Sequence, residues 1–550
     1  MWRFKAAAIQ TGSEAGATER NLERCLALLR EAGRNGAKLV VFPACMNAGY
    51  IYDDPEQAWA WATEIPGPFT EELGKVAAQL RTYVAIGLSE RGKGGRVYDS
   101  AAFIGSDGKL LGKHQKQCLE PVDRRWFSVG LTGYQVFETP IGKIGLCVCG
   151  DGRVPEGCRL MSLLGAEILV NCSNWPSRDQ YLLHVPARSV ENEAWTVTAD
   201  KPGSDRGLAF PGRSVILGPD GKTQIWGSED KEEIIYGTID LDLVQDVRAR
   251  PDSIMGNRRP ETYALLARRV ESLPVGRLLR KSVVPQTLGV TVAAVQVSPT
   301  GGDTDACLHR ALGMADEAGR LGMQFVVFPA LFPYVLPLGP REARLAAQRT
   351  PKLLKAFGAK AKAWGTYYAV HLVEAEGRHL YCTCYLIGPT GGVAGKYRQV
   401  HLLPAERAWA TPGTSYPVLA TRYGRVGLMA GFDLRFFEVA RIYACQGADL
   451  VLAPVAWREE SDERWLSPER GLGNRIFLVA ANRVDAPIRG RSKVFDPRGA
   501  IVAEAREERE EIATAYLNLA QARDKQIAPG TDLFRQRRPE LYGPLTKRGD

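Results

Sequence analysis

The residues best placed to do chemistry centre on a cysteine that follows a short apolar run. Residues 144–148 predict a buried strand that ends at Cys149 and Gly150, and Pro155 is typical of the first turn of a helix. A thiol between a strand and a helix lies where α/β proteins hold a nucleophile, and the N-terminus of the helix favours the thiolate. The alternative is a buried core cysteine, an interpretation that suits Cys147 better. The position alone does not separate the two interpretations.

Length and composition describe an ordinary globular protein of several domains. The chain has 550 residues, of which 45% are hydrophobic and 24% charged, so it is too long for a single core. The net charge of +9 comes from basic residues scattered among acidic ones, a pattern that predicts a solvated surface and argues against a nucleic-acid partner. The sequence shows no signal peptide and no run of about 18 apolar residues, so we expect a cytoplasmic protein without a membrane partner. The 11 cysteines and six histidines lack the spacing of a disulfide framework or a metal site, so we expect no metal.

The chain repeats itself once. The matching segments are 7–10 with 293–296, 39–44 with 325–330, 212–214 with 490–492, and 258–261 with 537–540. A period this long predicts two copies of one domain rather than a solenoid. We place the first domain at residues 1–270 and the second at 288–550, with the seam between them near 270–289.

The elements that must position Cys149 follow the same order in each copy. Leu22, Cys25, Leu26 and Leu29 are spaced as on one face of a helix. Residues 39–42 and 325–328 are continuous apolar runs, which are typical of strands buried on both faces. The sequence therefore predicts an α/β fold with helices outside the sheets.

Several motifs, taken together, resemble the nitrilase superfamily of carbon–nitrogen hydrolases. They are Phe42-Pro43, Gly112-Lys113 with Lys116, Cys149-Gly150-Asp151, and Arg188 with Glu191-Asn192. The resemblance covers nearly the whole chain, twice. It implies a tandem α-β-β-α sandwich whose domains pair as α-β-β-α:α-β-β-α within the chain. A homo-oligomer is a further form that we consider. The resemblance also implies that no cofactor takes part.

The same resemblance implies a Glu-Lys-Cys triad that attacks a small-molecule amide or nitrile, and this chain departs from it. The family's glutamate follows Phe-Pro directly, where this chain has Ala44 in the first copy and Ala330 in the second. Lys116 matches the family's lysine and Cys149 its nucleophile. The second copy carries Gln399 and Gly431 at the corresponding positions. The first copy thus retains two of the three groups and the second copy none.

Four further residues are candidates for the site of the first copy. Asp123 matches a second carboxylate of the family and is a candidate general base in place of Ala44. The alternative, which we favour, is that Asp123 forms an ion pair with Lys116, Arg124 or Arg125. Tyr50, Asn174 and Trp175 are candidate substrate-binding residues, or ordinary packing residues at strand ends.

Three hypotheses compete for the function. The first is a hydrolase that cleaves a non-peptide amide or nitrile through Cys149, with the second copy as an inactive scaffold. The second is a pseudoenzyme that binds a ligand or a partner. The third is a Cys149-dependent transferase of acyl or amidine groups. The retained Lys116 and Cys149 favour the hydrolase, although loss of a general base typically lowers the rate by roughly 10²–10⁴-fold.

Overall fold

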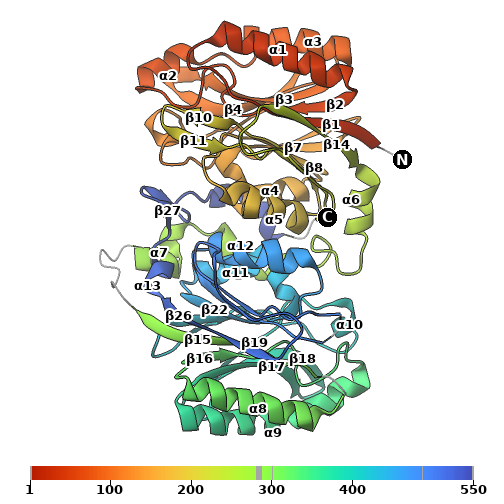
Figure 1. Ribbon diagram of the computed structural model, residues 1–550, viewed down its shortest axis with the longest axis vertical. Coiled ribbons are helices and arrows are strands. Elements are labelled where there is room, and N and C mark those ends of the chain that lie inside the picture. Colours follow the sequence, from red (N-terminus) through yellow and green to blue (C-terminus); the bar gives the residue numbers. More distant parts are fainter. Residues whose placement is uncertain (1–2, 280–287, 300–301, 486, 548–550) are drawn as a thin grey trace. The chain divides into compact units, whose positions relative to one another are not determined.

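The ends of the two repeats are exchanged between the two units of the structure. The computed structural model describes residues 3–279, 288–299, 302–485 and 487–547 (Figure 1). Unit 1 consists of Met1–Met255 together with Gln526–Asp550, and unit 2 of Gly256–Lys525. Each unit therefore includes the tail that follows the other repeat, whereas the predicted domains 1–270 and 288–550 keep each tail with its own repeat. Residues 280–287 of the predicted seam lie outside the described residues.

Unit 1 is built on two six-stranded sheets. The first sheet has the order β14 (Glu233–Asp240), β1 (Arg3–Gln10), β2 (Ala37–Val41), β3 (Tyr83–Arg91), β4 (Val97–Ile104) and β5 (Leu110–Gln115). The second has the order β13 (Gln224–Trp226), β12 (Val215–Leu217), β9 (Trp195–Ala199), β8 (Ile168–Cys172), β7 (Gly142–Val148) and β6 (Val136–Thr139). Two short ribbons complete it, β10 (Pro202–Asp205) with β11 (Leu208–Pro211), and β27 (Gln526–Ala528) with β28 (Thr531–Asp532).

The core of unit 1 shows why these strands form two facing sheets. Side chains alternate along β2, so Leu39 and Val41 pack in one cluster with Leu146 and Val170 of the second sheet. The intervening Val40 packs against the helices on the outer face. Those helices are α1 (Thr18–Arg34) and α3 (Pro68–Leu80), while α4 (Pro155–Leu163) and α5 (Val185–Asn192) cover the second sheet. The predicted α-β-β-α sandwich is confirmed.

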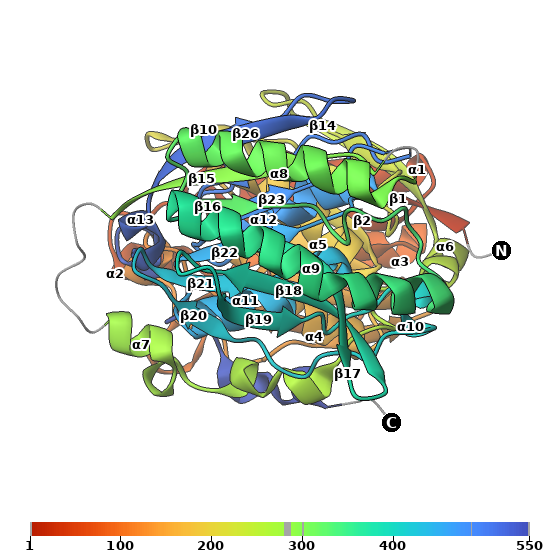
Figure 2. The same cartoon turned by 90° about the horizontal axis from the view of Figure 1, so that it is seen from below.

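Unit 2 repeats this architecture. Its first sheet has the order β19 (Val393–Arg398), β18 (His379–Ile387), β17 (Tyr367–Glu376), β16 (Phe325–Val327), β15 (Gly289–Gln296) and β26 (Glu511–Asn518). Its second has the order β20 (Val418–Ala420), β21 (Arg425–Leu428), β22 (Leu450–Pro454), β23 (Phe477–Ala481), β24 (Lys493–Phe495) and β25 (Ile501–Glu504). Figure 2 shows α8 (Thr304–Arg320) and α9 (Pro340–Trp364) side by side across the first sheet. The helices α11 (Phe437–Cys445) and α12 (Ser467–Leu472) follow strands of the second sheet as α4 and α5 do in unit 1.

The remaining helices are short connections. They are α2 (Pro55–Trp61), α6 (Leu241–Arg248), α7 (Pro274–Leu279), α10 (Pro404–Arg407) and α13 (Ala520–Arg523). Within the described ranges, no helix has both the length and the apolar character needed to span a membrane.

The exchanged tails are fixed by equivalent buried contacts. In unit 1, Arg537 Nε lies 3.1 Å from Glu156 Oε1 on α4, and the two side chains are 1% and 0% exposed. In unit 2, Arg258 Nε lies 3.1 Å from Glu438 Oε1 on α11. The matching segments 258–261 and 537–540 therefore hold equivalent places, each in the unit that contains the other repeat's sheets.

Candidate active site

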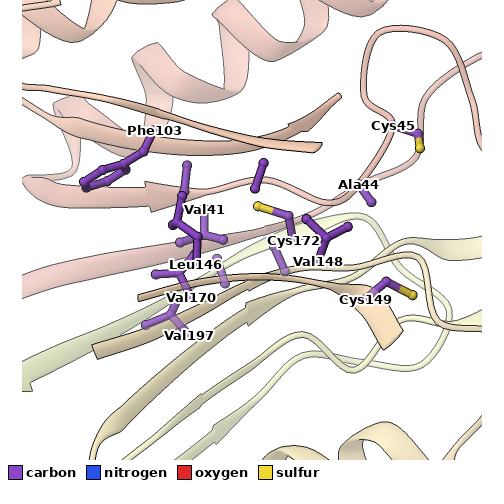
Figure 3. Packing of buried hydrophobic residues seen from close by; sticks show 14 of the residues in the cluster. Val41, Ala44, Cys45, Phe103, Leu146, Val148, Cys149, Val170, Cys172 and Val197 are labelled. Carbon is purple, nitrogen blue, oxygen red and sulfur yellow. The ribbon is translucent and has the colours of Figure 1, made fainter. Parts of the chain in front are cut away.

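Cys149 lies at a sharp turn between β7 and α4. The strand ends at Val148, a 3₁₀ turn spans Cys149–Arg153, and α4 begins at Pro155, as the sequence predicted. Cys149 has a φ of 43°, a left-handed conformation that is uncommon for any residue except glycine. Its side chain is buried. Figure 3 shows Cys149 at the end of its strand, across from Ala44 and Cys45, which follow β2 on the facing sheet.

Asp151 ties this turn to the segment that carries Lys116. Its Oδ1 accepts hydrogen bonds from the backbone N–H groups of Gln117 and Cys118, each at 2.9 Å. Its Oδ2 accepts one from the N–H of Val148 and lies 2.8 Å from Nε2 of His114. A single buried carboxylate therefore fixes the cysteine turn against the end of β5.

Lys116 is buried between two carboxylates. Its Nζ lies 2.7 Å from Oδ2 of Asp123 and 3.4 Å from Oδ2 of Asp99, and all three side chains are 0% exposed. Burial disfavours the ammonium, but the negative charges of Asp123 and its neighbours outweigh burial and hold the pKa of Lys116 well above its ordinary value. Lys116 is therefore a fixed cation inside the fold.

Asp123 pairs with Lys116 and not with the arginines beside it in sequence. Its Oδ2 also accepts the backbone N–H of Glu120 at 2.7 Å, and its Oδ1 accepts the hydroxyl of Tyr50 at 2.6 Å. Arg124 and Arg125 are exposed. Of the alternatives open from the sequence, the structure therefore shows the ion pair with Lys116, in which three donors occupy the oxygens of Asp123.

The electrostatic state of Cys149 differs from the expectation drawn from the turn alone. Burial raises the pKa of the thiol to about 12. Lys116 and a hydrogen bond from the backbone N–H of Asn174 lower this pKa, but Asp123 and Asp99 raise it further. The expected thiolate is therefore not the resting form, because burial and two carboxylates outweigh the lysine. The thiol needs a proton acceptor before it can attack.

Asp99 belongs to this cluster, although no pattern in the sequence marked it. It lies on β4, where every residue is buried, and its Oδ1 accepts a hydrogen bond from Cys45 Sγ at 3.5 Å. Burial raises the pKa of Asp99 to about 6, although Lys116 lowers it. The available signal was a lone carboxylate in a strand that is otherwise apolar or neutral, which no motif marks.

The three predicted substrate-binding residues lie around this cluster. The ring of Tyr50 lies 5.9 Å from Nζ of Lys116. The side-chain amide of Asn174 donates to the backbone carbonyl of Ala44 at 2.8 Å. Trp175 is buried, and its ring packs against the guanidinium of Arg153, which belongs to the turn that starts at Cys149. Within the described ranges, no three His, Cys, Asp or Glu side chains gather to hold a metal ion.

The second repeat has the same backbone arrangement as this site but lacks the thiol and the ammonium. Gly431 has a φ of 49°, close to that of Cys149, and a Cβ added there would lie 3.3 Å from the amide of Gln399. The N–H of Gln399 donates to Cys382, as that of Lys116 donates to Asp99. Gln399 Nε2 then lies 3.1 Å from Glu406 Oε2, in the place of the Lys116–Asp123 contact.

In the second repeat, the guanidinium of Arg483 lies next to Ala330, whereas the described part of the first repeat has no such contact at Ala44. The guanidinium of Arg483 donates to the carbonyl of Ala330 at 2.9 Å and to that of Tyr334 at 2.8 Å. In the first repeat, the corresponding carbonyl of Ala44 accepts from the neutral amide of Asn174. Cys382 stands where the first repeat has Asp99.

Comparison with known proteins gives a family match for both repeats and relatives that cover about half of the chain. A model of the carbon-nitrogen hydrolase family matches residues 5–249 and again 291–526. A nitrilase of Pyrococcus abyssi is 33% identical over 263 residues, which cover 47% of this chain and 98% of the relative. Omega-amidase NIT2 of Xenopus tropicalis is 32% identical over 261 residues, which cover 44% of this chain and 91% of the relative. Among solved structures, Nit3 of Saccharomyces cerevisiae, a member of branch 10 of the nitrilase superfamily, is 24% identical with a TM-score of 0.41, covering 45% of this chain and 93% of Nit3.

Proposed function

This chain belongs to the carbon–nitrogen hydrolase family, and from that membership we propose that its first repeat hydrolyses a non-peptide amide or nitrile through Cys149. The observation that carries the proposal is the strained turn at Cys149, which Asp151 ties to the segment of the buried cation Lys116. Strain of this kind persists where the surrounding structure over-determines it, and it is concentrated at active sites.

The proposed chemistry follows from these groups. The sulfur of Cys149 forms a bond to the carbonyl carbon of an amide, and the π electrons move onto the oxygen. Lys116 stabilises this oxyanion, because a fixed cation in a dry site acts far more strongly than in water. The C–N bond then breaks, the amine leaves with a proton, and water releases the acyl group from sulfur.

In this proposal the second repeat is a catalytically inactive partner. Gly431 has no thiol and Gln399 has no ammonium. Arg483 supplies a cation, but its donors bind the carbonyls of Ala330 and Tyr334. The contribution of the second repeat is structural, since Gln526–Asp550 complete unit 1.

A second candidate function is favoured by two observations. The pKa of about 12 for Cys149 and the absence of a carboxylate at Ala44 both suit a pseudoenzyme that binds an amide or nitrile without turning it over. The two candidates differ in whether a covalent bond to Cys149 ever forms.

Intact-mass measurement on the full chain tests this difference. The protein is mixed with a panel of small amides and nitriles, quenched in acid and digested to locate any adduct. We expect an acyl mass gain on Cys149 with release of ammonia, and loss of both in Cys149→Ala. Cys147→Ala is the matched control, because Cys147 Sγ lies 3.9 Å from Cys158 Sγ on the α4 side of β7. Absence of any adduct and of ammonia across the panel would establish the pseudoenzyme instead.

A further inference from the structure

We propose that Asp99 is the catalytic proton acceptor of this site: it takes the proton of the Cys149 thiol and delivers it to the departing nitrogen. The inference rests on the proposed function, because it needs a reaction at Cys149. It assigns a role to a residue that no motif in the sequence marks.

The position of Asp99 suits this role. The carboxylate of Asp99 has Lys116 on one side at 3.4 Å and the thiol of Cys45 on the other at 3.5 Å. Cys45 directly follows Ala44, so Asp99 from β4 reaches the loop after β2 where Ala44 itself offers no proton acceptor. The negative charge of Asp99 also raises the pKa of the Cys149 thiol, so the two groups interact electrostatically.

The two carboxylates beside Lys116 differ in how many hydrogen bonds they accept. Asp123 is held by a short ion pair, a hydroxyl and a backbone N–H. In the described part of the chain, Asp99 receives only the longer contact to Lys116 and a thiol, which is a weak donor. Asp99 therefore keeps lone pairs available for a proton, and its pKa of about 6 suits an acceptor that works near neutral pH.

The second repeat lacks the carboxylate of Asp99. At the position equivalent to Asp99 it has Cys382, and at the position equivalent to Cys149 it has Gly431. The carboxylate equivalent to Asp123 is retained there as Glu406. The repeat without a nucleophile thus lacks the Asp99 carboxylate and keeps the other one, which is the pattern expected if Asp99 serves the nucleophile.

The proton transfers balance. Asp99 accepts the thiol proton as the sulfur–carbon bond forms, and donates it to nitrogen as the C–N bond breaks. Asp99 then accepts a proton from the attacking water, the sulfur–carbon bond breaks, and the thiolate recovers that proton. Besides Cys149, the ionisable groups that face Asp99 are Lys116, Asp123, Cys45, Tyr52 and Cys172.

The test is the rate at which the acyl adduct forms on Cys149, measured by quenched-flow mass spectrometry across pH 4.5 to 8.5. In the wild type we expect the rate to fall below about pH 6, where Asp99 takes up its own proton. Asp99→Asn should lower the rate by roughly 10²–10⁴-fold and remove this fall. An unchanged rate in Asp99→Asn would overturn the inference.

A second variant keeps the test decisive if Asp99→Asn folds poorly. The hydrogen bond from Cys45 lowers the pKa of Asp99, so Cys45→Ala should move the fall in rate to higher pH. Cys25→Ala is the matched control, because Cys25 is an equally buried cysteine in the outer core formed with α1. If the pH at which the rate falls moves equally in Cys45→Ala and Cys25→Ala, or moves in neither, a role for Asp99 is contradicted. If the wild type itself forms no adduct, the proposed function fails and the inference falls with it. If the wild type forms the adduct, and the Asp99→Asn and Cys45→Ala variants form it at the same rate and with the same pH dependence, the inference alone fails.

Discussion

Cys149 and Gly431 hold the same left-handed backbone conformation, with φ angles of 43° and 49°. For a residue with a Cβ this conformation costs about 1–2 kcal/mol relative to the right-handed region. The second repeat avoids the cost with a glycine and thereby has no side chain to present. The first repeat retains the strained conformation at Cys149, whose thiol interacts electrostatically with Lys116.

Exchanging Cys149 for two small residues should reveal this strain. We expect Cys149→Gly to be more stable than Cys149→Ala by about 1 kcal/mol, because alanine at positive φ is destabilising. At Cys147, inside β7, the order should reverse, since glycine weakens a strand interior by about 0.5–1 kcal/mol relative to alanine. Urea denaturation of the four variants measures both differences. The same order at both positions would show that the turn at Cys149 carries no strain.

Lys116 should be essential for stability as well as for chemistry. Lys116→Met leaves Asp99 and Asp123 buried without a cation, and we expect a loss of about 3–5 kcal/mol in the free energy of unfolding. Lys116→Met combined with Asp123→Asn should recover part of this loss, because one uncompensated carboxylate is removed. A double-mutant cycle measures the coupling. Additive effects of the two substitutions would mean that the 2.7 Å contact does not couple them.

The sequence predicted the parts of this structure that depend on local pattern. Continuous apolar runs gave β2 and β16, helical spacing gave α1, and the repeat gave two copies of one fold. The strand-to-helix pattern marked Cys149 as a candidate nucleophile, whereas Lys116 was assigned from family motifs, because no periodicity relates residues so far apart in the chain.

What the sequence did not predict depends on burial and on distant neighbours. The raised pKa of Cys149 arises from desolvation and from two carboxylates, one of which is Asp99 on a separate strand. A pattern in β4 identifies a buried strand but not the thiol and ammonium that surround Asp99. The sequence did not predict the exchange of the tails either, because similarity between two repeats does not indicate which segments pack together.

Asp99 should make the stability of the protein depend on pH. Its pKa is raised from 3.8 to about 6 by burial, so the folded state holds a proton between these values that the unfolded state has lost. Stability from this group is therefore greatest below about pH 4 and falls as the pH rises through 6. The wild type should lose about 2 kcal/mol relative to Asp99→Asn between pH 4 and 7, at about 1.4 kcal/mol for each pKa unit. Urea midpoints of the two proteins across this range measure the difference; a constant difference would exclude the titration.

The tail after β26 should stabilise unit 1 through one buried ion pair. Arg537→Ala removes the ion pair between Arg537 and Glu156 of α4, in which both side chains are almost fully buried, and we expect a loss of about 3–5 kcal/mol. Arg535→Ala is the matched control in the same tail, because Arg535 is 65% exposed and 4.0 Å from Asp532, and it should change stability by less than about 1 kcal/mol.

Hydrogen exchange locates this effect within the chain. In Arg537→Ala the amides of α4 (Pro155–Leu163) should exchange faster, while those of α11 (Phe437–Cys445) in unit 2 stay as in the wild type. Arg258→Ala should give the opposite result, because Arg258 makes the equivalent contact with Glu438 of α11. If Arg537→Ala accelerated exchange in α11 and left α4 unchanged, the assignment of Gln526–Asp550 to unit 1 would be wrong.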